Sequence, residues 1–333
     1  MGRCLPARAA DARVLVEVRR RPDAEEERRE LLTELRRPLR SIPSKHFYDE
    51  RGLALFDRIT ELPEYYPTRT ERAILERIAP TVAAETGAAE LVELGSGSAT
   101  KTRLLLDALQ AEGTLGLYVP VDVNEAALVR VGEELVRDYR GLMVHGVAAD
   151  FLGPLAPLPS DGGSRLAIFL GGTIGNLRPR DEAPAFLGRL RAALLPGDWF
   201  LLGVDLVKDV TVLEAAYDDA QGVTAEFDRN VLRVVNRLLH ADFEPARFRH
   251  LAFYDRNEDW IEMRLVAEAA QVVRLGVSGE SLHLAAGEEI RTEISAKYTR
   301  ARAEALLAAS GFAPRQWHTD ERGWFAVALA RAI

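Results

Sequence analysis

Apolar residues follow two different spacings in the middle of the chain. Short, predominantly apolar runs lie at residues 91–95, 117–123, 143–150, 165–171 and 199–206. Between these runs, apolar positions recur every three or four residues at 102–112, 124–138 and 181–195. The first pattern is typical of buried strands and the second of amphipathic helices. Strands that alternate with helices predict an α/β fold with a parallel, doubly wound sheet.

The pattern changes after residue 206. Helical spacing at 210–219 and 224–240 is followed by strand-like runs at 247–255, 260–268 and 272–277. Such strands without intervening helices are typical of antiparallel sheet. From residue 298 the first pattern resumes, with a helix at 298–310 and a last strand at 324–329.

These changes predict two domains and a short leading segment. We expect residues 70–206 plus 298–333 to form the domain with the parallel sheet. Residues 23–69 plus 207–297 should form a second, α+β lobe that begins with a charged amphipathic helix. Residues 1–22 are expected to be irregular, with one candidate strand at 13–18.

A glycine turn joins the first strand to the helix that follows it. Gly95, Ser96 and Gly97 lie directly after the run at 91–95. Glycine allows backbone torsions closed to other residues and lets a ligand approach the main chain beside a helix N-terminus. A dinucleotide-binding turn would have a third glycine at position 100, where this chain has Thr100. The turn therefore indicates a nucleotide-sized ligand other than NAD.

Acidic residues end the next two strands. Asp122 is placed to bind both hydroxyls of a ribose, and Asp150 and Phe151 offer an acceptor for an adenine amino group and a ring that stacks on the base. Each feature alone is compatible with a tight turn and solvated loop acids. In this order and spacing, they favour S-adenosylmethionine (SAM) in a class I methyltransferase.

Two further segments are candidates for the other side of the site. The glycine-rich loop at 171–176 follows the fourth strand, and ligands bind beyond the carboxyl ends of such strands. Asn176 has both donor and acceptor atoms there, although a plain glycine turn is the alternative. Tyr65 and Tyr66 lie between two prolines, which display the rings from a stiff turn or pack a hinge.

Composition and charge exclude several other classes of protein. The 333 residues include 47% hydrophobic and 28% charged positions, as in soluble globular proteins. No apolar run approaches the roughly 18 residues of a membrane span, and the leading residues are too polar for a secretory signal. The net charge is −8, Cys4 is the only cysteine, and the histidines lack metal-site spacing. We expect a cytoplasmic monomer with no membrane, nucleic-acid or metal partner.

Seven motifs resemble one family closely, over the chain from about residue 40 onward. That family is the SAM-dependent, histidine-specific methyltransferases, which make hercynine, the trimethylbetaine of histidine, on the way to ergothioneine. The motifs lie at residues 47–49, 59–71, 93–97 with 101–103, 120–123, 171–176, 216–218 and 290–295. The run Leu-Pro-Glu-Tyr-Tyr-Pro-Thr at 62–68 is the most specific of them.

The resemblance implies a Rossmann-like sheet of seven strands and a role for each matching residue. The cofactor set would be Tyr65, Gly95, Ser96, Gly97, Lys101, Asp122, Asp150 and Phe151. Asn176 and Tyr217 would hold the α-carboxylate and orient the α-amine, with the Gly171 carbonyl close to the amine. Glu293 and Ser295 would bind the imidazole, and Tyr48, Thr224 and Met263 would line the pocket.

The chemistry of such a reaction needs an uncharged amine aimed at the sulfonium methyl group. Burial near a sulfonium disfavours the charged amine, so proton loss needs no strong dedicated base, and water or Tyr48 is the candidate relay. The catalytic set is then Tyr48, Asn176 and Tyr217. The alternatives are an acceptor that is another aromatic amino acid or amine, and a SAM-binding regulator without activity. The pair Glu293 and Ser295 is also what a polar strand face at period two would show.

Overall fold

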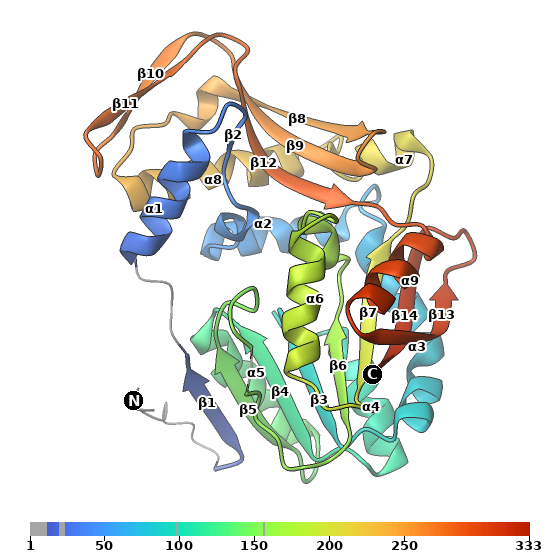
Figure 1. Cartoon of the computed structure of the whole chain (residues 1–333). Coiled ribbons are helices and arrows are strands. Elements are labelled where there is room, and N and C mark those ends of the chain that lie inside the picture. Colours follow the sequence, from blue (N-terminus) through green and yellow to red (C-terminus); the bar gives the residue numbers. More distant parts are fainter. Residues whose placement is uncertain (1–11, 20–23, 98, 156) are drawn as a thin grey trace.

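A computed structural model describes residues 12–19, 24–97, 99–155 and 157–333 (Figure 1). Its larger sheet has eight strands in the order β1-β5-β4-β3-β6-β7-β14-β13. Their bounds are β1 Val14–Val18, β3 Glu90–Leu94, β4 Leu117–Asp122, β5 Met143–Ala148, β6 Arg165–Phe169, β7 Trp199–Asp205, β13 Phe312–Thr319 and β14 Phe325–Ala332. All neighbours are parallel except β14, which is antiparallel to both β7 and β13. The predicted α/β fold with a parallel sheet is confirmed, and β13 and β14 complete the sheet as an antiparallel hairpin.

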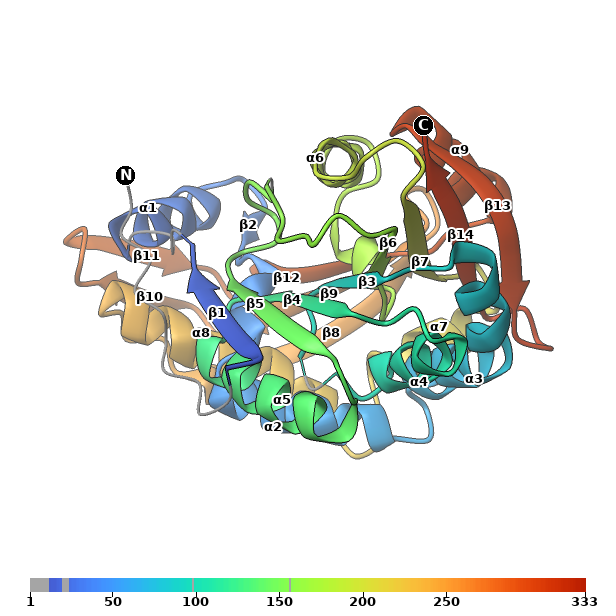
Figure 2. The same cartoon turned by 90° about the horizontal axis from the view of Figure 1, so that it is seen from below.

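Helices cover both faces of this sheet (Figure 2). One face carries α3 (Pro67–Thr86), α4 (Thr102–Glu112) and α5 (Glu125–Asp138), and the other carries α6 (Glu182–Ala192) and α9 (Arg300–Ala309). Successive strand residues face opposite sides, so Leu91 belongs to the first hydrophobic cluster and Val92 to the second. Burial on both faces explains why the strands are continuous apolar runs in the sequence.

The sheet has one strand more than the seven expected. The candidate strand at 13–18, in a segment otherwise expected to be irregular, is present as residues 14–18 and pairs in parallel with β5 at the edge of the sheet. Val14 and Val16 are buried against α5, where a side chain at Gly132 would come within 2.9 Å of Val14. Only two apolar side chains hold the strand, which is why its sequence signal is weak. Cys4 lies outside the described residues.

The second lobe contains a four-stranded sheet, β2-β12-β9-β8, and a separate hairpin, β10–β11. The strands are β2 Arg40–Ser41, β8 Phe248–Asp255, β9 Trp260–Ala267, β10 Gln271–Leu275, β11 Glu280–Leu284 and β12 Glu289–Ala296. The helices are α1 Ala24–Leu35, α2 Glu50–Glu61, α7 Val210–Ala215 and α8 Val223–Leu239. A third hydrophobic cluster is built from these elements and favours the proposed division into two domains.

The chain also passes from β1 to α1, and three further crossings between the two lobes lie close together. They are the start of α3, the segment after β7, and the segment after β12. The last two are hydrogen-bonded to each other, since Tyr298 N donates to Asp205 O at 2.8 Å and Val207 N donates to Tyr298 O at 3.1 Å. In the described ranges, no helix has the length and apolar character needed to cross a membrane.

Candidate active site

Two glycines give the turn after β3 a backbone conformation that other residues rarely adopt. Gly95 and Gly97 have φ values of 70° and 49°, in the left-handed region that favours glycine. A Cβ atom at Gly95 would lie 3.3 Å from the Phe151 ring. Ser96 between them is buried, and its carbonyl accepts from Ala99 N at 2.9 Å. The turn therefore leaves room for a ligand against its main chain.

The acids predicted for a nucleoside lie beside this turn. Asp122 accepts hydrogen bonds from Gly97 N and Asn124 N, both at 3.0 Å, so its carboxylate is fixed at the end of β4. Asp150 follows β5 and accepts from Leu152 N at 2.8 Å. The next residue, Phe151, packs edge-on against Phe169 with ring centroids 5.4 Å apart. The structure brings these predicted cofactor residues to one edge of the sheet.

Lys101 is connected to the other half of the site by a residue that the sequence did not single out. Glu71, on α3, is fully buried and pairs with the Lys101 ammonium group. The same carboxylate accepts from Gly171 N, with N–O distances of 2.7 and 2.9 Å. A side chain at Gly203 would collide with it, at 2.1 Å. Glu71 thus fixes the cofactor turn to the loop after β6, although only its place in the motif at 59–71 distinguishes it in sequence.

That loop also packs closely against strand β12. Asn176 ends the short 3-10 helix Thr173–Asn176. A Cβ atom at Gly175 would lie 2.8 Å from the Ala296 carbonyl and 3.4 Å from Ser295 Oγ. Only glycine allows this approach, which places Asn176 next to the acceptor-side strand.

Strand β12 presents Glu293 and Ser295 on one face, as their period-two spacing predicts. Glu293 lies opposite the buried Met263 of β9 in the strand register. The Ser295 hydroxyl is 2.8 Å from the hydroxyl of Tyr217. Thr224 is buried in the first turn of α8, where its backbone N–H donates to Asp219 at 2.7 Å.

Three tyrosines contribute aromatic surface from different elements. The rings of Tyr65 and Tyr217 meet edge to face with centroids 6.4 Å apart, and Tyr48 packs similarly on Phe227. Burial raises the pKa of all three hydroxyls well above the ordinary value of 10, so they are protonated at neutral pH. Tyr48 is nevertheless 38% exposed, as expected for a ring that lines a recess. None of these tyrosines supplies a tyrosinate base.

Glu293 is the unpaired carboxyl of the site. Within the described part of the chain, its side chain makes no hydrogen bond or ion pair, and Tyr48, Asp228 and Lys297 interact with it only through charge. Burial, and then the charge of Asp228, raises its pKa to about 8, against the opposing effect of Lys297. Glu293 is half-buried and lines a cleft, so a carboxyl with a raised pKa and no protein partner at this place is a candidate for binding a ligand.

This raised pKa predicts a pH-dependent gain in stability for Glu293→Gln. The folded state binds an extra proton between the ordinary pKa of 4.5 and the folded value of about 8, so stability falls as pH rises through that window. Glutamine does not titrate, so the variant should not lose stability in this pH window. At pH 5 we expect the two ligand-free proteins to have similar free energies of unfolding, measured by thermal denaturation. At pH 9 the free energy of unfolding of the variant should be larger by about 1–3 kcal/mol. An equal difference at both pH values would contradict the assignment.

One cleft is lined by members of both sets, although its lining includes neither Asp122 nor Ser295. It has a volume of about 1090 Å³ and is lined by Asp150, Asn176 and Glu293, among others. It therefore extends from the adenine-side acid to the unpaired carboxyl. Among the residues that the structure describes, no group of three or more His, Cys, Asp or Glu side chains is arranged to hold a metal ion.

The strand order, the glycine turn and the acids after β4 and β5 define a class I SAM-dependent methyltransferase. Residues 27–332 match the family described as histidine-specific methyltransferase, SAM-dependent. The match covers most of the chain, so the protein belongs to this family, and the resemblance stated from its motifs is confirmed.

Individual relatives are assigned different amino acids. The histidine N-alpha-methyltransferase of Mycobacterium tuberculosis (strain CDC 1551 / Oshkosh) is 47% identical over 303 residues, which cover 91% of this chain and 94% of that protein. The L-tryptophan methyltransferase of Psilocybe serbica is 27% identical over 320 residues, or 88% of each chain. A solved SAM-dependent methyltransferase from Clostridium acetobutylicum ATCC 824 has a TM-score of 0.45 and 11% identity, covering 84% of this chain and 98% of that one.

Proposed function

We propose that the protein transfers three methyl groups from SAM to the α-amino group of L-histidine and forms hercynine, a step of ergothioneine biosynthesis. The observation that carries the choice of acceptor is the unpaired carboxyl of Glu293 beside the Ser295 hydroxyl on β12. An imidazole ring has two nitrogens, and these two groups match them. The 47% identity to a histidine N-alpha-methyltransferase supports the same acceptor.

The cofactor half of the proposal fits SAM. A cofactor that approaches the backbone at Gly95, Ser96 and Gly97 would meet Asp122, whose position suits the ribose hydroxyls. Asp150 and Phe151 would bind the adenine, and Lys101 and Tyr65 the methionine portion. When bound, SAM supplies an electrophilic methyl group on a sulfonium. The protein's task is to hold that group in line with the acceptor nitrogen.

On the acceptor side, Asn176 and Tyr217 would hold the α-carboxylate, with the Gly171 carbonyl near the amine. Glu71 supports this arrangement because it holds both Gly171 N and Lys101, so the loop that faces the amine and the turn that faces the cofactor keep a fixed distance. Thr224, Met263 and Tyr48 would enclose the side chain. This geometry favours attack by a nitrogen presented from the cleft.

Proton release follows from the same groups. The amine must lose its proton before attack, and a nearby positive charge lowers its pKa. Because burial raises the pKa of Tyr48, its hydroxyl stays protonated and would relay the amine proton only by releasing its own proton as it accepts that one. Alternatively, a water molecule would take the amine proton directly. Each methylation removes a donor from the amine and leaves a larger cation, which the faces of Tyr48 and Tyr65 would stabilise.

The test is incubation of the purified protein with SAM and each proteinogenic amino acid in turn, followed by mass spectrometry. We expect histidine to gain mass in steps of one CH₂ unit, up to three. The identity to an L-tryptophan methyltransferase makes another aromatic amino acid the second candidate. Products from tryptophan but not histidine would replace the first proposal with the second, and binding of SAM without any product would indicate a regulator.

A further inference from the structure

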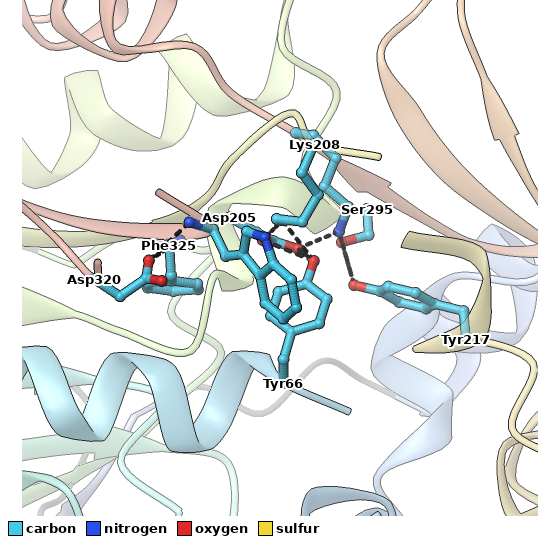
Figure 3. Close-up of polar contacts among 9 residues, drawn as sticks. Tyr66, Asp205, Lys208, Tyr217, Ser295, Asp320 and Phe325 are labelled. Atoms are coloured by element: carbon cyan, nitrogen blue, oxygen red, sulfur yellow. Dashed lines mark hydrogen bonds and ion pairs between the residues drawn. The ribbon is translucent and has the colours of Figure 1, made fainter. Parts of the chain in front are cut away.

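Lys297 is a fully buried lysine that lies directly behind the two acceptor-side hydroxyl groups. Its ammonium group donates to Tyr217 Oη at 2.9 Å and to Ser295 Oγ at 2.8 Å, and it pairs with Asp205 Oδ2 at 2.8 Å. Figure 3 shows the hydroxyls of Tyr217 and Ser295 converging beside Asp205. Neither the sequence motifs nor the proposed roles above include this lysine.

The hydrogen bonds of Lys297 account for all of its donors. An ammonium group has three N–H bonds and no acceptor, and here each N–H has its own oxygen partner. Tyr217 and Ser295 therefore both accept from Lys297. Since burial raises the pKa of Tyr217, both hydroxyls also keep their protons.

Counting those two protons shows how many the pair can still offer to a ligand. The Tyr217 and Ser295 oxygens are 2.8 Å apart, so one hydroxyl donates to the other. The second proton has no acceptor within this trio. We propose that Lys297 is a positioning residue that fixes Tyr217 as the donor to Ser295 and directs the remaining O–H, that of Ser295, toward the acceptor substrate. The site then offers a donor at Ser295 and an acceptor at Glu293. In this arrangement Asn176 holds the α-carboxylate, and Tyr217 meets the α-amine through its oxygen.

This inference rests on the proposed function and specifies the form of the substrate. A neutral imidazole has one N–H and one bare ring nitrogen. The N–H would donate to Glu293 and the bare nitrogen would accept from the hydroxyl pair. Without Lys297, either hydroxyl could turn to accept instead, and the preference for a bare nitrogen would be lost.

Asp205 holds the Lys297 side chain in place through their ion pair. Burial alone would raise the pKa of Asp205, but the Lys297 and Lys208 ammonium groups hold it below its usual range. Lys208 contacts Asp205 Oδ1 at 2.5 Å and the Tyr66 hydroxyl at 2.6 Å. Among the hydrogen bonds of the described residues, none joins Lys208 to Tyr217 or Ser295. Lys208 therefore resembles Lys297 in side-chain burial and charge, but it pairs with the other carboxylate oxygen of Asp205.

The two lysines give a matched pair of variants, Lys297→Met and Lys208→Met, each of which leaves Asp205 with one lysine partner. The readout is kcat/KM for histidine divided by kcat/KM for a pyrrolylalanine that keeps the ring N–H and has C–H in place of the bare nitrogen. For the native protein we expect a ratio of about 100 or more. Lys297→Met should lower this ratio at least about 10-fold, because kcat/KM for histidine falls while kcat/KM for the analogue does not. Lys208→Met should leave the ratio within about 2-fold of the native value.

Equal losses for both substrates in Lys297→Met, or the same change of ratio in Lys208→Met, would overturn the proposal. Ser295→Ala repeats the test without removing a buried charge, and its ratio must also fall at least about 10-fold. An unchanged ratio there would refute the proposal even if Lys297→Met failed to fold. If the native protein leaves histidine unmethylated, the proposed function itself has failed, which is a separate outcome.

Discussion

Replacing Asp122 with alanine should weaken SAM binding by at least about 100-fold. The carboxylate is fixed by Gly97 N and Asn124 N at the end of β4, and each oxygen accepts only one of these hydrogen bonds, so both can accept another from a ligand. Two hydrogen bonds from ribose hydroxyls to a charged acceptor contribute about 1.5–3 kcal/mol each. Isothermal titration with SAM measures the loss directly.

Two controls separate this contact from general effects of charge and folding. Asp138→Ala removes an acid that pairs with Arg103 on the outer surface and should leave SAM affinity unchanged. Asp122→Asn keeps one acceptor oxygen and should lie between the native protein and the alanine variant. A SAM affinity for Asp122→Ala within about 5-fold of the native value, with an unchanged thermal midpoint, would place the ribose elsewhere.

Several parts of this site are predictable from the sequence because a few consecutive residues identify each of them. The runs at 91–95 and 117–123 are apolar because both faces of the sheet are covered, so a few consecutive residues suffice to identify them. Gly95 and Gly97 follow directly on a strand, and Asp122 directly ends one. The rule that ligands bind at the carboxyl ends of parallel strands then assembles these residues without any further contact information.

The parts that sequence reasoning missed depend on partners far away in the chain. In the sequence, Glu71 is one acid on an amphipathic helix. In the structure, its carboxylate binds both Lys101 and Gly171, which are 30 and 100 residues away. Lys297 lies just beyond a polar strand, and its role depends on Tyr217, 80 residues away. Charged side chains have the same appearance in sequence whether they are solvated or paired in the core.

The double variant Glu293→Ala/Met263→Val should change the acceptor from histidine to a larger aromatic amino acid. Glu293 and Met263 are directly opposite each other on β12 and β9, so truncating both enlarges one continuous part of the pocket. The loss of Glu293 leaves the imidazole N–H without an acceptor, and polar mismatches of this kind in a buried site cost orders of magnitude in kcat/KM. We expect the ratio of tryptophan to histidine kcat/KM to rise by about 1000-fold or more.

The two single variants separate the loss of histidine activity from the gain of space for a larger ring. Glu293→Ala alone should remove most of the histidine activity, because Ser295 still donates but nothing accepts from the ring. Met263→Val alone should cost about 1 kcal/mol of stability, since the side chain is buried, and change the ratio only modestly. Relative rates for the two amino acids that stay the same in the double variant would mean that the ring binds away from β12. The hydroxyl pair held by Lys297 would then have to face the α-carboxylate, the other acceptor that an amino acid offers.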